Sequence, residues 1–203
     1  MVRPAPPSHP QVADARPLLL LDVDGVVCPL FPPPPGRPAL YVSVPETPFK
    51  KVWIDPELPH WLKTLQPLYR MVWASSWEEA ANQSLRTALG LPILPVLLLP
   101  HLRTQDGDTY KLETVRNYVR NESFAWVDDV LGAGVHHWAD SRSAPTLLVE
   151  TRSRMGIHEG DFRELLDFGQ QMARGRGDIS LITDSPSHQS GPHVQTSDQS
   201  RSL

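Results

Sequence analysis

A run of four leucines at residues 18–21 leads directly into Asp22, Val23, Asp24 and Gly25, and no other segment limits the possible folds as strongly. A short, uninterrupted apolar run is typical of a strand buried on both faces, as in a parallel sheet. Because side chains alternate along a strand, Asp22 and Asp24 leave it on the same side, and Gly25 permits a sharp turn beyond them. Two carboxylates this close repel each other, so we expect a cation, a shared proton or a metal ion beside them.

Strands and helices are predicted to alternate along the rest of the chain. Apolar runs predict further strands at residues 40–44, 49–54, 68–74, 93–99, 124–127 and 146–149, of which the first two form a hairpin flap. Helical spacing of apolar residues predicts helices at 55–66, 78–89, 111–120 and 162–172. This alternation indicates an α/β, Rossmann-like fold with a mostly parallel sheet, which binds ligands at the carboxyl ends of its strands.

The chain ends differ in composition from its middle. Residues 1–16 are rich in proline and predict a flexible leader, while Arg, Gly, Ser and Gln dominate 173–203 and predict a disordered tail. The segment 17–172 is then one folded domain, which suits a chain of 203 residues. The first residues lack the apolar core of a signal peptide, and the leucine run is too short to span a membrane. We therefore expect a soluble, cytoplasmic protein.

Charge and cysteine content exclude several classes of protein. The net charge of −4 argues against a broad basic surface for nucleic acid or anionic lipid, although a small patch is compatible with it. Cys28 is the single cysteine, which excludes an internal disulfide and a cysteine-based zinc site, and we interpret it as a small buried hydrophobe. His136 and His137 are adjacent and would face different ways on a helix, so we predict surface residues rather than metal ligands.

Polar side chains stand at the predicted carboxyl edge of the sheet. They comprise two acidic pairs, two serines and one lysine from four segments: Asp22, Asp24, Ser75, Ser76, Lys111, Asp128 and Asp129. Several carboxylates together suit Mg²⁺, which prefers oxygen ligands. A carboxylate can attack phosphorus as a nucleophile, and hydroxyl and ammonium groups stabilise the charge on a transferring phosphoryl group. The set therefore predicts phosphoryl transfer.

The order of these segments resembles that of the haloacid dehalogenase (HAD) superfamily of phosphatases and related hydrolases. Its four motifs match DVDGV at residues 22–26, a strand that ends in Ser75, Lys111 at a helix start, and the pair Asp128-Asp129. The resemblance covers roughly residues 17–172, and the segments WASSWEEAAN and GLPILPV are similar to a compact bacterial branch of that superfamily. It implies a five-stranded sheet of order 5-4-1-2-3.

The resemblance also implies a role for each residue. Asp22 would be the nucleophile that becomes phosphorylated, and Asp24 would protonate the leaving group and then activate water. Mg²⁺ would be bound by Asp22, the backbone carbonyl of Asp24 and Asp128, with Asp129 a direct or water-mediated ligand. Ser75 and Lys111 would bind the phosphoryl oxygens of the substrate. Because Asp24 is present, phosphoester hydrolysis is favoured over cleavage of a carbon–halogen bond.

Simpler interpretations of these residues remain open. The first acidic pair could belong to a solvated turn, and Lys111 could be a surface residue, although a cation at a helix start is unfavourable unless anions lie near it. Asp129 could be only a helix N-cap. Ser75 is preferred to Ser76 as the phosphate ligand because it ends the strand. Trp77 could equally pack in the core or line the entrance to the site.

The substrate is not specified by these motifs. The segments after the first and third strands are too short for a large cap domain, so the site is expected to be open to a nucleotide, a nucleic-acid end or a phosphoprotein. Two rival functions remain: an end-processing phosphatase of an RNA or DNA repair type, and a binding module that keeps the fold without catalysis. We predict a Mg²⁺-dependent phosphatase.

Overall fold

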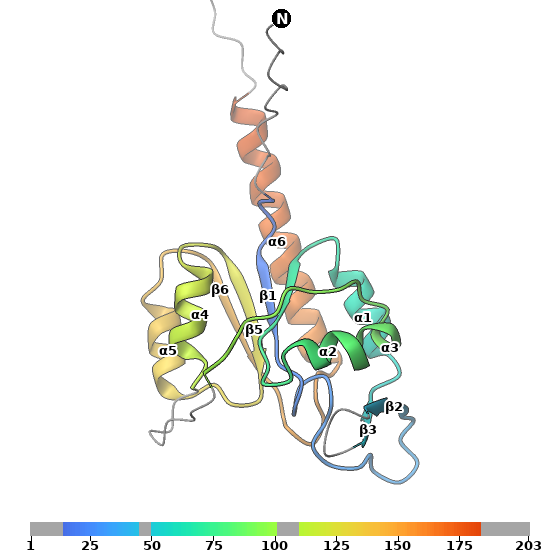
Figure 1. Ribbon diagram of the computed structural model, residues 1–203. Helices are drawn as coiled ribbons and strands as arrows, with labels where there is room; N and C mark the ends of the chain where they lie inside the picture. The colour runs from blue at the N-terminus through green and yellow to red at the C-terminus, as the bar shows by residue number, and fades with distance from the viewer. Residues whose placement is uncertain (1–13, 45–49, 101–109, 184–203) are drawn as a thin grey trace, which may run out of the picture.

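A parallel sheet forms the centre of the protein. The computed structural model describes residues 14–44, 50–100 and 110–183. Its main sheet contains four strands in the order β4 (Arg70–Trp73), β1 (Leu18–Leu21), β5 (Phe124–Asp128) and β6 (Thr146–Glu150) (Figure 1). All neighbouring strands are parallel, so their carboxyl ends lie at one edge of the sheet. The α/β fold predicted from the sequence is confirmed.

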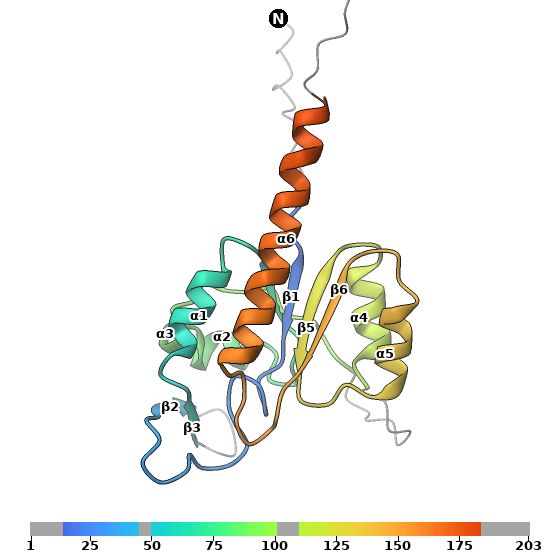
Figure 2. The same ribbon diagram turned by 180° about the vertical axis from the view of Figure 1, so that it is seen from behind.

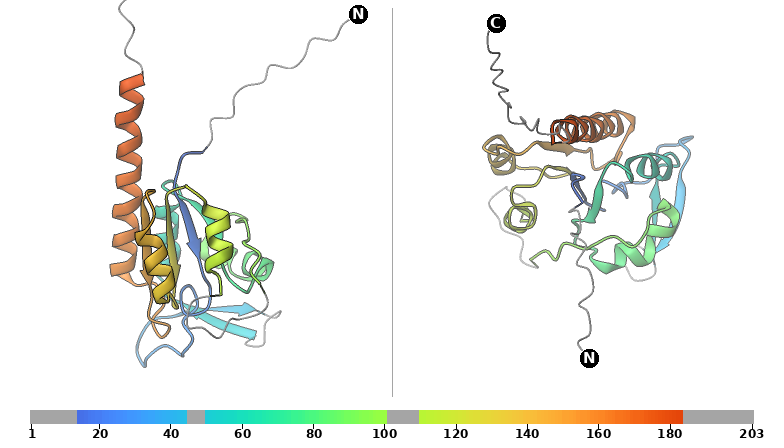
Figure 3. Two further views of the ribbon diagram at one scale, coloured as in Figure 1. Left: turned by 90° about the vertical axis from the view of Figure 1, so that its left-hand side faces the viewer. Right: turned by 90° about the horizontal axis from the view of Figure 1, so that it is seen from above.

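The leucine run forms the central strand β1 and is buried on both faces. Leu19 and Leu21 belong to one apolar cluster, and Leu18 and Leu20 to another on the opposite side of the sheet. The first cluster includes residues of α1 (Leu58–Leu65), α2 (Glu79–Ser84), α3 (Arg86–Leu89) and α6 (Glu159–Thr183). The second includes residues of α4 (Leu112–Val119) and α5 (Ala133–Asp140). Figures 2 and 3 show α6 along one face of the sheet and α4 on the other.

The predicted five-stranded order 5-4-1-2-3 is wrong, because the sheet has four strands in the order β4-β1-β5-β6. Residues 93–99 form no strand and meet β4 only at a bridge between Trp73 and Val96. The Trp73 amide donates to the Pro95 carbonyl over 2.9 Å, and the Leu97 amide donates to the Trp73 carbonyl over 2.8 Å. Pro95 has no N–H, so a regular ladder does not extend through this segment.

Two helices differ in length from their predictions. The helix predicted over 78–89 is divided at Leu85 into α2 and α3, and Gly90 ends the second part in the left-handed conformation, as predicted. The final helix α6 continues to Thr183, beyond residue 172, where the sequence predicts the end of the folded domain. In Figure 1, this end of α6 projects past the sheet on the side opposite the hairpin.

The predicted hairpin is formed by β2 (Leu40–Val44) and β3 (Lys50–Ile54), which pair antiparallel near the carboxyl edge of the main sheet (Figures 1 and 3). It is fixed to the domain, because Val44 and Ile54 are fully buried in the first cluster. Residues 1–13, 45–49, 101–109 and 184–203 lie outside the described residues, and with them most of the leader predicted over 1–16 and of the tail predicted over 173–203. Within the described part of the chain, no helix combines the length and the apolarity needed to cross a membrane.

Candidate active site

The first acidic residue is held at the carboxyl end of β1. Asp22 is buried, its amide donates to the Val127 carbonyl over 3.1 Å, and its Oδ1 accepts from the Val23 amide over 2.7 Å. The chain then turns at Gly25, whose φ of +73° is unfavourable for other residues. The Gly25 amide donates to the Cys28 carbonyl over 2.8 Å, which closes the turn.

Lys111 joins the two acidic segments. Its Nζ lies 2.6 Å from Asp22 Oδ2 and 2.7 Å from Asp128 Oδ2, and its side chain is 4% exposed. Asp128 also accepts a hydrogen bond from Trp126 Nε1 over 3.2 Å and one from the Val130 amide over 3.1 Å. The structure thus excludes the interpretation of Lys111 as a surface residue. Although Trp126 is fully buried in the core, its indole N–H also orients a site carboxylate, which an apolar sequence pattern does not indicate.

The structure brings together three carboxylates that fit a metal ion. Oxygen atoms of Asp22, Asp128 and Asp129 lie within 4.8 Å of one another. Asp129 lies directly over Gly25, since a Cβ at that glycine would be 2.1 Å from Asp129 Oδ2. Several carboxylates near one ammonium group leave an excess of negative charge, and a hard divalent cation with oxygen ligands would balance it. The donors therefore fit a divalent metal ion, although the Asp24 side chain is not part of this group.

Asp24 lies apart from the cluster and has a different partner. Its Oδ2 accepts a hydrogen bond from Trp77 Nε1 over 3.0 Å. Trp77 is partly buried and packs against the first apolar cluster, which agrees with the core alternative, while its indole N–H also reaches Asp24. Burial raises the pKa of Asp24, and the hydrogen bond from Trp77 opposes this shift. A carboxyl group with a raised pKa is better suited to donating a proton than one that is fully ionised.

The two serines after β4 have different surroundings. Ser75 is fully buried, and its carbonyl accepts from the Glu78 amide over 3.1 Å, whereas Ser76 is exposed. The Ala74 amide donates to the Leu21 carbonyl over 2.8 Å, so Ser75 lies just beyond β4, at the edge of the sheet where Asp22 follows β1. This placement agrees with the preference for Ser75, whose contact with phosphate stays a prediction.

Burial and charge shift the ionisation of the groups around Lys111 in opposite directions. Burial and the neighbouring charge of Asp22 raise the pKa of Asp128 to about 6, although Lys111 opposes the shift. Burial by itself would lower the pKa of Lys111, but Asp22 and Asp128 raise it above its ordinary value. The ammonium form of Lys111 is therefore favoured between these two carboxylates.

The histidine and the cysteine that the sequence excludes as metal ligands are not part of the group of three carboxylates. His136 Nε2 is 3.9 Å from Glu150 Oε2, and both side chains are about half exposed. Cys28 is buried, and burial raises the pKa of its thiol, so it is a poor nucleophile. One contact that the sequence did not indicate is made by Thr151, whose Oγ1 donates to the Gly25 carbonyl over 2.8 Å.

The parallel sheet, with acidic residues after β1 and β5 and a lysine between them, is the arrangement of a HAD-type hydrolase. A family model described as "HAD domain in Swiss Army Knife RNA repair proteins" matches residues 18–162. The chain belongs to this family, and thus to the HAD superfamily. None of the curated proteins and none of the solved structures matches the chain.

Proposed function

We propose that this domain is a Mg²⁺-dependent phosphatase that transfers the phosphoryl group of its substrate to Asp22 and then to water. The observation that carries the proposal is the buried contact of Lys111 with Asp22 and Asp128, beside a second carboxyl group, Asp24, with a raised pKa. A buried nucleophile, a separate proton donor and a fixed cation are the groups that phosphoryl transfer requires.

Asp22, Asp128 and Asp129 would hold the magnesium ion, because their oxygens converge within 4.8 Å of one another. The ion would supply positive charge that binds the phosphoryl oxygens and offsets the repulsion between them and the carboxylates. The close packing of Asp129 on Gly25 supports a defined orientation for this carboxylate. The ligand role that the sequence assigns to the Asp24 carbonyl stays a prediction.

In the first step, the Asp22 carboxylate attacks phosphorus, and the bond from phosphorus to the ester oxygen breaks. Asp24 donates its proton to that oxygen, so the substrate leaves as an alcohol. The Asp22 side chain is well oriented for this step, because Oδ1 is fixed by the Val23 amide and Oδ2 by Lys111. Its side chain therefore loses little freedom on reaching the transition state.

In the second step, the ionised Asp24 accepts a proton from water, and the hydroxide attacks the phosphorus of the aspartyl phosphate. The bond between phosphorus and Asp22 breaks, inorganic phosphate leaves, and both carboxyl groups return to their starting states. Lys111 and the Ser75 hydroxyl would stabilise the negative charge on the phosphoryl oxygens during both steps. Lys111 is close enough to do so while it remains bound to Asp22.

The Asp24→Asn variant provides the sharpest test, because it separates the two steps. With p-nitrophenyl phosphate, whose leaving group needs no proton, the first step continues, and the second slows by about 10²–10⁴-fold. The phosphorylated protein then accumulates, and mass spectrometry of acid-quenched peptides finds one added phosphoryl group on Asp22. Asp22→Asn, the matched control, carries no such group. A wild-type protein that releases no phosphate from any substrate, or an active Asp22→Asn variant, contradicts the mechanism.

A second candidate is an end-processing phosphatase of RNA or DNA, which the description of the matched family favours. We infer that such a protein removes terminal phosphates from oligonucleotides faster than from sugar phosphates. Steady-state rates on oligonucleotides with a 3′- or a 5′-phosphate measure this preference and the end that is processed. A rate no higher than that for a simple sugar phosphate contradicts it.

A further inference from the structure

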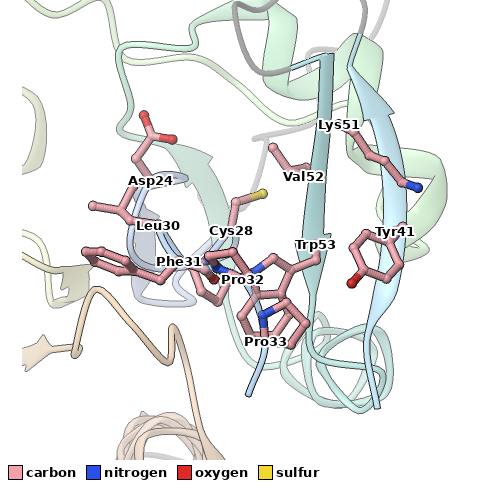
Figure 4. A pocket seen from close by; sticks show the side chains of 11 residues that line it. Asp24, Cys28, Leu30, Phe31, Pro32, Pro33, Tyr41, Lys51, Val52 and Trp53 are labelled. Atoms are coloured by element: carbon pink, nitrogen blue, oxygen red, sulfur yellow. Dashed lines mark hydrogen bonds between the residues drawn. The ribbon is translucent and has the colours of Figure 1, made fainter. Parts of the chain in front are cut away.

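A cavity of about 250 Å³ lies between the turn after β1 and the hairpin (Figure 4). Asp24 stands at one end of this pocket, and Tyr41 and Lys51 of the hairpin stand at the other. Its walls also include Phe31, on the side of Asp24, and Trp53. The pocket therefore connects the proposed proton donor to a group of three aromatic rings.

The alternation of side chains in the hairpin explains why aromatic residues face this pocket. Tyr41 pairs directly with Trp53, and paired residues of antiparallel strands point to the same face. Val44 and Ile54 lie on the other face and are buried in the core. Trp53 is 5% exposed, and its Nε1 donates to the Phe31 carbonyl, so it is a fixed wall of the pocket.

The other two rings are accessible and lie beside positive charges. Tyr41 is 55% exposed and Phe31 is 43% exposed, so a ligand can reach both rings. Lys51 Nζ lies 4.6 Å from the centre of the Tyr41 ring, and Arg154 Cζ lies 4.0 Å from that of Phe31. The entrance to the pocket thus combines flat apolar surfaces with cations, although the net charge of the chain is negative.

We propose that this pocket binds the nucleobase of the nucleotide whose phosphate reacts at Asp22, with Tyr41 and Phe31 stacking on the base. This assignment rests on the proposed phosphatase function and adds a substrate class to it. Stacking on aromatic side chains is the general way in which proteins hold unpaired bases, and it depends little on the sequence. Lys51 and Arg154 are placed to contact the phosphates of a nucleotide strand.

The end of a nucleotide strand fits these features better than a phosphorylated peptide does. The cavity is smaller than the roughly 300–1,000 Å³ of typical small-molecule sites, which suits one flat ring system. A phosphotyrosine could also place a ring there, but it carries only one phosphate, which would be bound at Asp22. It would leave Lys51 and Arg154 without an anionic partner from the substrate. A strand end supplies further phosphates for both.

The test compares substrates that differ only by a base. We expect kcat/KM with Mg²⁺ to be about 5- to 150-fold higher for adenosine 5′-monophosphate than for ribose 5-phosphate, the range that one stacked base provides. Adenosine 3′-monophosphate is measured in parallel, in case the chain prefers that end. Tyr41→Ala and Phe31→Ala reduce this ratio toward one, whereas Tyr41→Phe keeps it. Tyr118→Ala, which alters a 38% exposed ring on α4, is the matched control and leaves the ratio unchanged.

A binding measurement separates this inference from the proposed reaction. Asp22→Asn with Mg²⁺ is titrated with both adenosine monophosphates and with ribose 5-phosphate in a calorimeter, and we expect a nucleotide to bind more tightly by a similar factor. Equal kcat/KM values in an active phosphatase overturn the pocket assignment alone. A preference for phosphotyrosine peptides over nucleotides also overturns it, in favour of a phosphoprotein substrate. If nothing is hydrolysed, the proposed reaction fails, and the titration alone decides whether the pocket binds a base.

Discussion

Replacing Lys111 by methionine tests the electrostatic basis of the site. Methionine keeps most of the length of the side chain but removes an ammonium group bound to Asp22 over 2.6 Å and to Asp128 over 2.7 Å. Both carboxylates then stay buried without that cation, and removing one partner of a buried ion pair costs about 3–5 kcal/mol. We expect the free energy of unfolding of the metal-free protein to fall by this amount near neutral pH.

The same variant should regain stability when its carboxylates are neutralised. Protonation at lower pH removes the repulsion between Asp22 and Asp128, so the difference from wild type shrinks as the pH falls. Mg²⁺ acts in the same direction if it binds the native state, since a ligand at 100 times its Kd adds about 2.7 kcal/mol. Phosphatase activity should nevertheless stay at least about 10²-fold below wild type, because the charge of Lys111 on the phosphoryl group is lost.

Urea denaturation followed by tryptophan fluorescence measures both effects, with and without Mg²⁺ and across a range of pH. Lys63→Met is the matched control, because Lys63 is an exposed residue in the last turn of α1. It should change the free energy of unfolding by no more than about 1 kcal/mol, through the helix dipole. If Lys111→Met is within 1 kcal/mol of wild type under all conditions, Lys111 does not offset the buried carboxylates, and our account of the site is refuted.

Three further perturbations address other parts of the site. Gly25→Ala introduces a Cβ 2.1 Å from Asp129 Oδ2 at a φ of +73°. We expect the free energy of unfolding to fall by about 1–3 kcal/mol and calorimetry to show weaker Mg²⁺ binding. An unchanged Mg²⁺ affinity would exclude Asp129 as a ligand. Trp77→Phe removes the hydrogen bond that lowers the pKa of Asp24. The basic limb of the pH–rate profile should therefore move to higher pH. A basic limb at the wild-type pH would argue against Asp24 as the acid. The pKa of Asp128 is raised to about 6 from an ordinary 3.8, so this group stabilises the metal-free protein fully below about pH 4 and loses that contribution as the pH rises through 6. Urea denaturation without metal measures this loss of stability. A free energy of unfolding that rises over that range would contradict it.

The central strand and the acidic edge of the sheet were predictable because their signals are local. Four leucines in a row leave no polar face, so a strand at residues 18–21 must be buried on both sides. The end of this strand then fixes the position of Asp22, and the same logic places Asp128 at the end of β5. The functional interpretation of Lys111 was favoured because a cation at a helix start needs anions nearby, and the structure supplies two.

Features that depend on tertiary contacts could not be read from the chain in this way. The apolar run at residues 93–99 has strand composition, but it pairs with β4 only at one bridge, beside Pro95, which has no N–H for a ladder. Trp77 and Trp126 fit an apolar pattern, and only the fold reveals that each indole N–H meets a site carboxylate. Likewise, alternation in the hairpin predicts two faces but does not say that Tyr41 borders a cavity.

In the hairpin, the residues that stabilise the fold differ from the residues that line the proposed substrate pocket. Val44 and Ile54 anchor it to the core, so its position is tied to the cooperative folding of the whole domain. Tyr41 and Lys51 point away from that anchor and can change with little effect on folding. Related sequences can therefore diverge in the molecules they accept through a few outward positions, while the reaction centre below stays constant. A protein built in this way can acquire new substrates without first losing its stability.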